Sequence, residues 1–255
     1  MPIRHGLSGA RAWALLDRAD RPVRYLKAAR SDDAAGDVPG YGTVIGEADR
    51  ARWARSQGLP APAVLDAGHD GGWDVMLSAA VPGVPMSELS GAAALSAVAG
   101  LADLLASMHH LPIDRCPFRR DLDVLLDGAA TAVATGTVRA DDFDDVRGDC
   151  TPAEPLAIAQ RDRPATEDLA VCHGDACLPN VLVDPDSGAV TGIVDLGRLG
   201  IADRHSDLAL AVRSLGDPEL NPGYGAAAAG DFLRRYPDRA DPRLLEYYQL
   251  VDEFF

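Results

Sequence analysis

The N-terminal third of the chain alternates short apolar runs with polar turns, a pattern typical of β-strands. The expected strands cover residues 12–18, 22–29, 63–67 and 73–81. Between the second and third of them, residues 44–57 carry apolar and small side chains at helical spacing, and Gly58 marks the end of that helix. The Pro82-Gly83 pair then interrupts the pattern and predicts a hinge.

Beyond residue 83 the apolar positions mostly follow the period of a helix. The clearest example is 92–111, where a buried stripe is expected to comprise Leu95, Val98, Leu101, Ala102, Leu105 and Met108. Further helices are expected near 121–135, 141–147, 153–161, 203–215, 224–236 and 241–252. Three short strands at 169–172, 181–183 and 190–194 interrupt this helical region. The pattern predicts an α+β fold, with a small β-rich lobe with one helix at 1–81 and a larger, mostly helical lobe with a short β insertion at 82–255.

Charge narrows the range of partners. The 255 residues include 24 Lys and Arg against 39 Asp and Glu, a formal net charge of −15. Such a surface repels nucleic acid and anionic membranes, so we expect neither as a partner. The longest apolar runs are broken within about ten residues, whereas a membrane helix needs about 20. Hydrophobic and charged contents of 47% and 25% are ordinary for a globular protein and exclude disordered and collagen-like classes.

The four cysteines form no CxxC pair and follow no secretory leader. We therefore expect a cytoplasmic protein in a reducing environment. The simplest interpretation of the cysteines themselves is that they are small buried apolar side chains.

Two polar segments lie at the ends of the inserted strands. HGDACLPN at 173–180 places Asp175 just beyond one strand and Asn180 five residues later, and DLGR at 195–198 places Asp195 at the end of another strand. Asn180 and Asp195 offer the hard oxygen ligands that Mg²⁺ prefers. Asp175 is then left to accept or orient the proton of a hydroxyl group. The order HGDxxxxN followed by DxG predicts a site for phosphoryl transfer.

The small lobe offers a matching cation. Lys27 ends the apolar run 23–27, and Glu47 lies in the helix that follows. Taken alone, each is more often an exposed surface residue. Because the downstream motifs are present, we interpret them as a lysine–glutamate pair that steadies nucleotide phosphates.

Together these motifs make the chain resemble the aminoglycoside 3'-phosphotransferases, antibiotic kinases with a protein-kinase-like fold. The densest matching segment is DLGRLGIADRHSDL at 195–208. The other matching segments are SGA at 8–10, Lys27, GEA at 46–48, LPAP at 59–62, VPG at 81–83, CPF at 116–118, 167–180, 190–210 and LVDEFF at 250–255. The resemblance implies a bilobal protein-kinase-like fold and ATP-dependent phosphorylation of the 3'-hydroxyl of aminoglycosides, which confers resistance.

The resemblance also implies roles for individual residues. Asp175 matches the catalytic aspartate, and Asn180 and Asp195 match the Mg²⁺ ligands. On the nucleotide side, the matching positions are Lys27 with Glu47 at the ATP phosphates, Ser8 in the loop that covers them, Tyr25 stacked on adenine, and Ser78 and Ala80 as backbone partners of the adenine edge.

Two acidic segments fit a polycationic substrate. One is the group Asp141, Asp142, Asp144 and Asp145, and the other is the tail with Asp252, Glu253 and the carboxylate of Phe255. A solvated face and a frayed end are the ordinary explanations, but the apolar run 244–251 predicts a docked tail. The resemblance implies that the drug's ammonium groups are bound by Asp142, Asp144, Asp145, Asp252, Glu253 and Phe255, with Arg198 beside them.

Several polar side chains are expected to be structural. His173 is expected to hold the catalytic loop through a backbone hydrogen bond, and Asp203 and Asp207 are expected to cap a helix and brace that loop. His109 and His110 follow an apolar helix and are expected to be core or capping residues.

The start of the chain departs from the family pattern. Only 26 residues precede Lys27, so we expect a first strand that is short or missing. Two alternatives stay open: a kinase for another small hydroxylated amine or sugar, and a non-catalytic kinase-like binding protein whose shortened lobe no longer holds ATP productively. We expect a monomer or a weak dimer.

Overall fold

The small lobe is built on an antiparallel sheet. The computed structural model describes residues 1–3, 10–31, 42–138, 143 and 150–255. Within them, the sheet has the strand order β1-β2-β3-β5-β4. Its strands are β1 (Pro2–Ile3), β2 (Arg11–Leu16), β3 (Pro22–Arg30), β4 (Val64–Asp70) and β5 (Trp73–Ala79). The described part of the first strand comprises Pro2 and Ile3.

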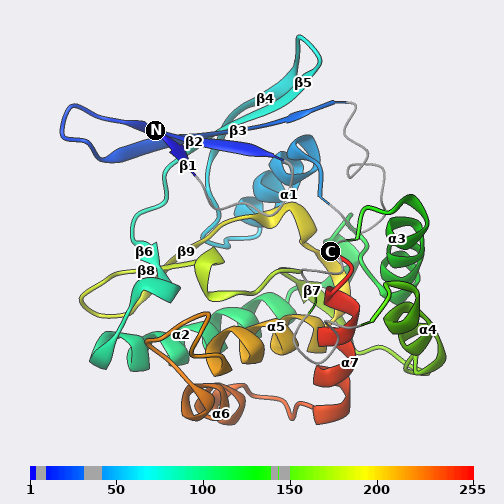
Figure 1. The fold of residues 1–255 in the computed structure, drawn as a ribbon. Helices are drawn as coiled ribbons and strands as arrows, with labels where there is room; N and C mark the ends of the chain where they lie inside the picture. Colours follow the sequence, from blue (N-terminus) through cyan, green and yellow to red (C-terminus); the bar gives the residue numbers. More distant parts are fainter. Residues whose placement is uncertain (4–9, 32–41, 139–142, 144–149) are drawn as a thin grey trace.

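The described residues of the small lobe form one α-helix, α1 (Val44–Ser56), which lies between the sheet and the larger lobe (Figure 1). Its start is set by Thr43, whose hydroxyl accepts a hydrogen bond from the backbone N–H of Gly46 at 3.0 Å. Gly58 adopts a left-handed φ of 84° just beyond its end, as the sequence predicts. Val44 and Ala48 pack with Met76 of the sheet, whereas Ala51 and Ala54 belong to the main core of the larger lobe.

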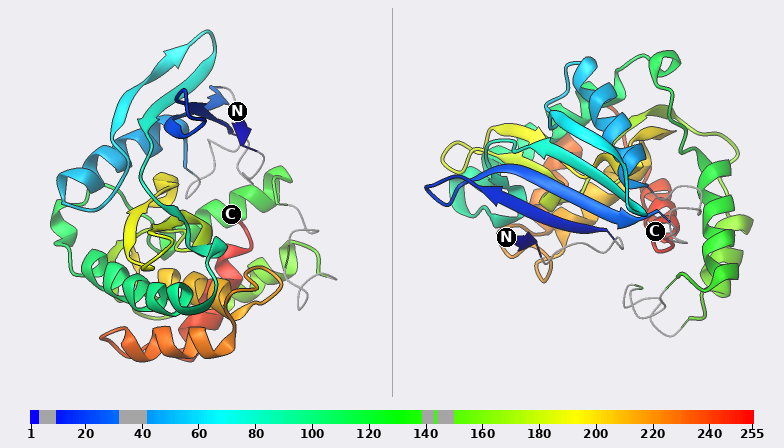
Figure 2. Two further views of the ribbon diagram at one scale, coloured as in Figure 1. Left: turned by 90° about the vertical axis from the view of Figure 1, so that its left-hand side faces the viewer. Right: turned by 90° about the horizontal axis from the view of Figure 1, so that it is seen from above.

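The larger lobe is mostly helical. Its helices are α2 (Gly91–His109), α3 (Leu122–Thr135), α4 (Ala153–Arg161), α5 (His205–Gly216), α6 (Ala226–Arg235) and α7 (Pro242–Asp252). α2, α5 and α6 lie beneath the β insertion, and α3 and α4 form a pair at the edge of the lobe (Figures 1 and 2). The predicted helix at 141–147 lies, apart from residue 143, outside the described residues.

The expected apolar stripe of α2 is correct except at its start. Val98, Leu101, Ala102, Leu105 and Met108 are all buried, but Leu95 is 68% exposed. Ala94 and Ala97 face the core instead, because the inward face at this end of the helix passes through them and leaves Leu95 on the outer side.

α2 departs from the expectation that the longest apolar runs are broken within about ten residues. By length and composition, this helix could cross a membrane. Its inner face, however, is packed into the main core of the larger lobe. That burial is the ordinary situation of a core helix, and such a helix is weak evidence for a membrane span.

The β insertion forms two small sheets rather than one region. β7 (Leu169–Cys172) pairs with β10 (Gly200–Asp203), and β8 (Val181–Val183) lies between β6 (Val84–Pro85) and β9 (Val190–Ile193). The sequence pattern missed β6 and β10, and it placed the start of α5 at 203, which is the last residue of β10. Gly83 allows β6 to approach this sheet, since its φ is 113° and a Cβ there would collide with Thr191 and Val183. The turn between β9 and β10 contacts α1, where Arg50 donates from Nε to the Leu199 oxygen at 2.8 Å.

Candidate functional site

A lysine and two carboxylates form an ionic group between the lobes. Lys27 of β3 donates from Nζ to Glu47 Oε2 at 2.6 Å and to Asp195 Oδ1 at 2.9 Å. Burial alone would lower the pKa of Lys27, but the charges of Glu47 and Asp195 outweigh it and raise the pKa. The lysine is therefore fully protonated at neutral pH. The structure brings together the predicted Lys27–Glu47 pair and adds Asp195 to it.

Asp195 stands at the junction of β9 and the short 3₁₀ turn η6 (Leu196–Arg198). Its backbone is left-handed, with φ 59° and ψ 56°, which is uncommon for a residue other than glycine. Burial would raise the pKa of Asp195, but Lys27 outweighs it and holds the pKa below its ordinary value. Its side chain is still 48% exposed, so the carboxylate can also reach a ligand in solution.

The loop that the sequence predicts to be catalytic follows β7 and ends in the 3₁₀ turn η5 (Leu178–Asn180). Asn180 donates from Nδ2 to the backbone oxygen of Asp175 at 3.0 Å and to Asp175 Oδ2 at 2.9 Å. The Val194 N–H donates to the backbone oxygen of Asn180 at 2.9 Å, and Val181 pairs with Ile193 in the β8–β9 ladder. Asn180 and Asp195 therefore lie at adjacent ends of neighbouring strands.

This donor set fits a divalent cation. Asn180 offers Oδ1, because its Nδ2 is engaged by Asp175, and Asp195 offers Oδ2, because its Oδ1 faces Lys27. These are the neutral amide and carboxylate oxygens that suit Mg²⁺ when it also binds phosphate and water. The residues present thus suit the metal that the sequence predicts.

A buried carboxylate braces the loop from behind. Asp207 of α5 accepts hydrogen bonds from the backbone N–H groups of His173 at 2.7 Å and Gly174 at 2.8 Å, and from His109 Nε2 at 3.1 Å. His173 in turn donates from Nε2 to the Val194 oxygen and accepts from the Asp175 N–H at Nδ1. The expected structural roles of His173 and Asp207 are confirmed. Asp203 accepts from the His205 N–H at the start of α5, although the N-cap position itself is Arg204.

The predicted adenine-side residues lie on neighbouring strands. Tyr25 of β3 pairs in register with Ser78 of β5, and Tyr25 is half-buried while Ser78 is buried. The N–H of Ala80 donates to the Val23 oxygen at 3.0 Å, so this donor already has a backbone partner. Ser8 lies outside the described residues.

The C-terminal tail is docked against the site, as predicted. Asp252 Oδ1 accepts from Arg198 Nη1 at 3.2 Å, and Asp252 Oδ2 accepts from Arg213 Nη2 at 2.7 Å. Arg198 also donates to the terminal oxygen of Phe255. Phe254 is buried and its ring meets that of Phe143 edge-on at 6.3 Å. Asp142, Asp144 and Asp145 lie outside the described residues.

Comparison with known proteins decides the family. The model of the phosphotransferase enzyme family matches residues 2–245. The chain belongs to this family. It is 41% identical to an aminoglycoside 3'-phosphotransferase of Streptomyces fradiae, over 99% of this chain and 94% of the relative. The predicted family resemblance and enzyme class are thereby confirmed.

Solved structures confirm the predicted fold of this phosphotransferase. An aminoglycoside-3'-phosphotransferase of type VIII superposes with a TM-score of 0.82 at 39% identity, covering 97% of this chain and 94% of the other. The aminoglycoside phosphotransferase APH(3'')-Id of Streptomyces rimosus, in complex with ADP and streptomycin, gives 0.81 at 30% identity, covering 100% and 91%. The bilobal protein-kinase-like α+β fold is therefore that of its relatives.

Two arginines of the phosphotransferase were not recognised from the sequence. Arg213 lies in the apolar run of α5. A charge in such a run was a signal that it had an ionic partner, which is the partly buried Asp252. Arg120 lies in the Arg-Arg-Asp group that follows the CPF segment. This group shows no helical or strand pattern, so the sequence does not indicate which of its side chains points inward. Only the tertiary structure shows that Arg120 is buried.

Asp207 yields a prediction about stability. Burial would raise its pKa, but hydrogen bonds from His109 and the Gly174 N–H outweigh burial and hold the pKa below the ordinary 3.8. The unfolded chain therefore binds more protons just below pH 3.8, and Asp207 stabilises the fold above that pH and loses this effect as the pH falls. We expect Asp207→Asn to lower the free energy of unfolding by about 3 kcal/mol at pH 7. Urea denaturation of the wild type and the variant between pH 3 and 7 measures this difference in the free energy of unfolding.

The matched control is Asp186→Asn in an exposed turn. Asp186→Asn should leave the free energy of unfolding unchanged. Below pH 3.8, the free energy of unfolding of Asp207→Asn should depend less on pH than that of the wild type. Equal stabilities of the two variants would contradict the bracing role.

Proposed function

We propose that this phosphotransferase transfers the γ-phosphoryl group of ATP to the 3'-hydroxyl of kanamycin- and neomycin-type aminoglycosides, which confers resistance to them. The observation that carries the proposal is the convergence of Lys27, Asp175, Asn180 and Asp195 from three separate segments on one site. The similarity to 3'-phosphotransferases of this substrate class supports the choice of acceptor.

Each residue has a task that its contacts suit. Lys27, held by Glu47, offers a permanent positive charge to the phosphates of the nucleotide. Asp175, with Oδ2 fixed by Asn180, presents its other oxygen to the acceptor hydroxyl and takes its proton as the oxygen attacks phosphorus. Mg²⁺ held by Asn180 and Asp195 would neutralise negative charge on the transferring phosphoryl group.

The remaining assignments belong to the same proposal. Tyr25 stacks on adenine beside the backbone of Ser78 and Ala80, and the loop containing Ser8 covers the phosphates. The aminoglycoside is received by Asp252, Glu253 and Phe255, with Arg198 beside them, and by the acidic group Asp142, Asp144 and Asp145. Since both oxygens of Asp252 face arginines, its contribution is to place the tail as much as to attract ammonium groups.

We also propose that the enzyme acts in the cytoplasm, where ATP is available, as a monomer or weak dimer. Its two lobes are proposed to divide between residues 81 and 82. Cys116 and Cys172 are buried, and all four cysteines are unpaired, which suits a reducing compartment. Size-exclusion chromatography with light scattering checks the oligomeric state.

A second acceptor position has an observation in its favour. The similar structure of APH(3'')-Id contains streptomycin, so the 3''-hydroxyl of a streptomycin-type drug is the competing acceptor. The test is ADP release from Mg–ATP with kanamycin, with streptomycin, and with a kanamycin analogue lacking the 3'-hydroxyl, each against reactions that omit one component.

If, of the three compounds, only kanamycin causes ADP release, the result supports phosphorylation of the 3'-hydroxyl. ADP release with the analogue or with streptomycin would show that another hydroxyl is the acceptor. Absence of release with every aminoglycoside, together with retained nucleotide binding, would favour another small hydroxylated acceptor. Absence of both would favour the non-catalytic binding protein.

A further inference from the structure

Two adjacent arginines have opposite environments. Arg119 has a side chain that is 63% exposed and forms an ion pair with Asp121. Arg120 is only 5% exposed and has no carboxylate within ion-pair distance among the described residues. Its Nε is buried without a hydrogen-bond partner. Burying a cation without an ionic partner costs free energy, so other contacts of Arg120 must compensate for its burial.

The contacts of Arg120 lead to the last residue of the chain. Its guanidinium carbon lies 5.4 Å from the centre of the Phe255 ring, and that of Arg198 lies 5.9 Å from the same centre. Both distances are within the range of a cation–π interaction. Two arginines from different segments thus hold one terminal ring.

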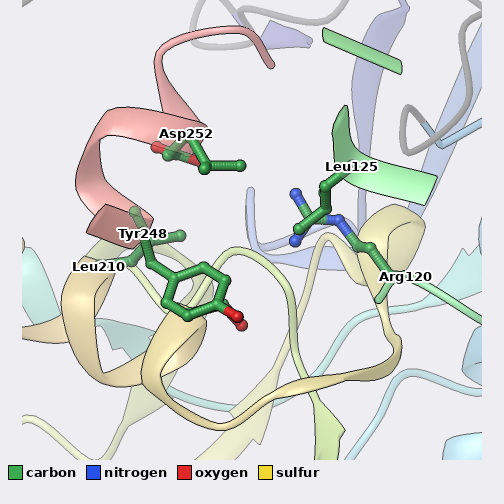
Figure 3. Close-up of a pocket in the computed structure, with 7 residues that line it drawn as sticks. Arg120, Leu125, Leu210, Tyr248 and Asp252 are labelled. Atoms are coloured by element: carbon green, nitrogen blue, oxygen red, sulfur yellow. The ribbon is translucent and has the colours of Figure 1, made fainter. Parts of the chain in front are cut away.

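A small pocket extends this contact to α7. Arg120, Tyr248 and Asp252 line it together with Leu125 and Leu210, and the Tyr248 hydroxyl is also buried without a partner (Figure 3). Asp252 begins the tail and Phe255 ends it, so Arg120 lies beside both. Its charge faces Asp252, Asp207 and Asp175 at longer range.

The charge on Arg120 persists at neutral pH. Burial, and then the neighbouring charge of Arg198, lower the pKa of Arg120 to about 10, while the three aspartates oppose the change. A guanidinium with that pKa is still protonated in the range where the enzyme works.

We propose that Arg120 is a positioning residue for the C-terminal tail, holding Phe255 and Asp252 where they receive the substrate and thereby setting the affinity for the aminoglycoside. The role in affinity rests on the function proposed above. The role in placing the tail does not, because it follows from contacts within the protein alone.

The experiment compares Arg120→Met with the matched control Arg119→Met. Arg120→Met keeps an apolar side chain of similar length but removes the charge and the planar group. We expect the KM for kanamycin to rise about tenfold with kcat nearly unchanged, because the lost contact orders the substrate site and does not touch the reacting atoms. Arg119→Met should match the wild type in both parameters.

A second readout needs no substrate. Carboxypeptidase should release Phe255 from Arg120→Met about tenfold faster than from the wild type, as mass spectrometry of the chain measures it, since a less tightly docked end is more accessible. If the wild type failed to phosphorylate kanamycin, the proposed function would fail, and this readout would still decide the placement of the tail.

A double-mutant cycle with Phe255→Ala isolates the contact. If Arg120 acts through Phe255, Arg120→Met should add little to the rise in KM already caused by Phe255→Ala. Fully additive effects, or equal carboxypeptidase rates for the Arg120 and Arg119 variants, would overturn the proposal. If Arg120→Met does not fold, Arg120→Lys is used in its place. Its ammonium group lacks the planar guanidinium, so carboxypeptidase should release Phe255 from it faster than from the wild type. Release of Phe255 at the wild-type rate would contradict the proposal.

Discussion

Asp175→Asn is expected to reduce kcat for phosphoryl transfer to kanamycin by about 1,000-fold. An amide cannot take the proton of the attacking hydroxyl. The loop around it should survive, because Asn180 also donates to the backbone oxygen of residue 175, and Asp207 holds His173 and Gly174 from behind. Steady-state ADP release measures the loss.

The control for this variant is again Asp186→Asn, which removes an equal charge from an exposed turn of the same lobe. It should keep wild-type activity. Asp175→Asn should retain the melting temperature and the dissociation constant for ATP, which separates loss of chemistry from loss of fold. Near-normal kanamycin phosphorylation by Asp175→Asn would refute the proposed mechanism.

Asp195→Asn should be the second most damaging change, with kcat/KM lowered about 100-fold. The carboxylate lies at the ends of β8 and β9 beside Asn180 and also faces Lys27 at 2.9 Å. The amide can still accept the lysine hydrogen bond through Oδ1, so the change chiefly removes the charge that would hold Mg²⁺. A titration of activity against Mg²⁺ concentration measures the effect.

The signature of Asp195→Asn is a higher Mg²⁺ requirement. Part of the lost activity should return at high Mg²⁺, whereas Asp175→Asn should gain nothing from added metal. An unchanged Mg²⁺ dependence in Asp195→Asn would show that Asp195 is not a metal ligand and would leave its contact with Lys27 as its role.

The elements of the fold were largely predictable because they depend on local patterns. The cap at Thr43 and the left-handed Gly58 enclose α1 where the sequence places it. The exceptions are β6 and β10, which the sequence pattern missed. β6 has two residues and β10 has four, and each exists because a partner strand distant in the chain completes it.

The central residues of the site were also predictable, since their chemistry is carried by residue type at fixed spacing. Lys27 and Glu47 do meet, and Asp175 and Asn180 do share hydrogen bonds. What spacing could not show is that Asp195 joins the lysine pair and that both oxygens of Asp252 face arginines. Those contacts join positions 168, 54 and 39 residues apart.

The sequence by itself determined the candidate reacting groups, the class of enzyme they suggest and an excess of acid that a polycation could neutralise. Only the tertiary structure decided how those charges are balanced. It placed three arginines about the acidic tail and buried one of them, Arg120, without a carboxylate partner among the described residues. The physical reason is that burial and ion pairing depend on which distant segments pack together, and a local pattern of apolar and polar residues carries no record of that.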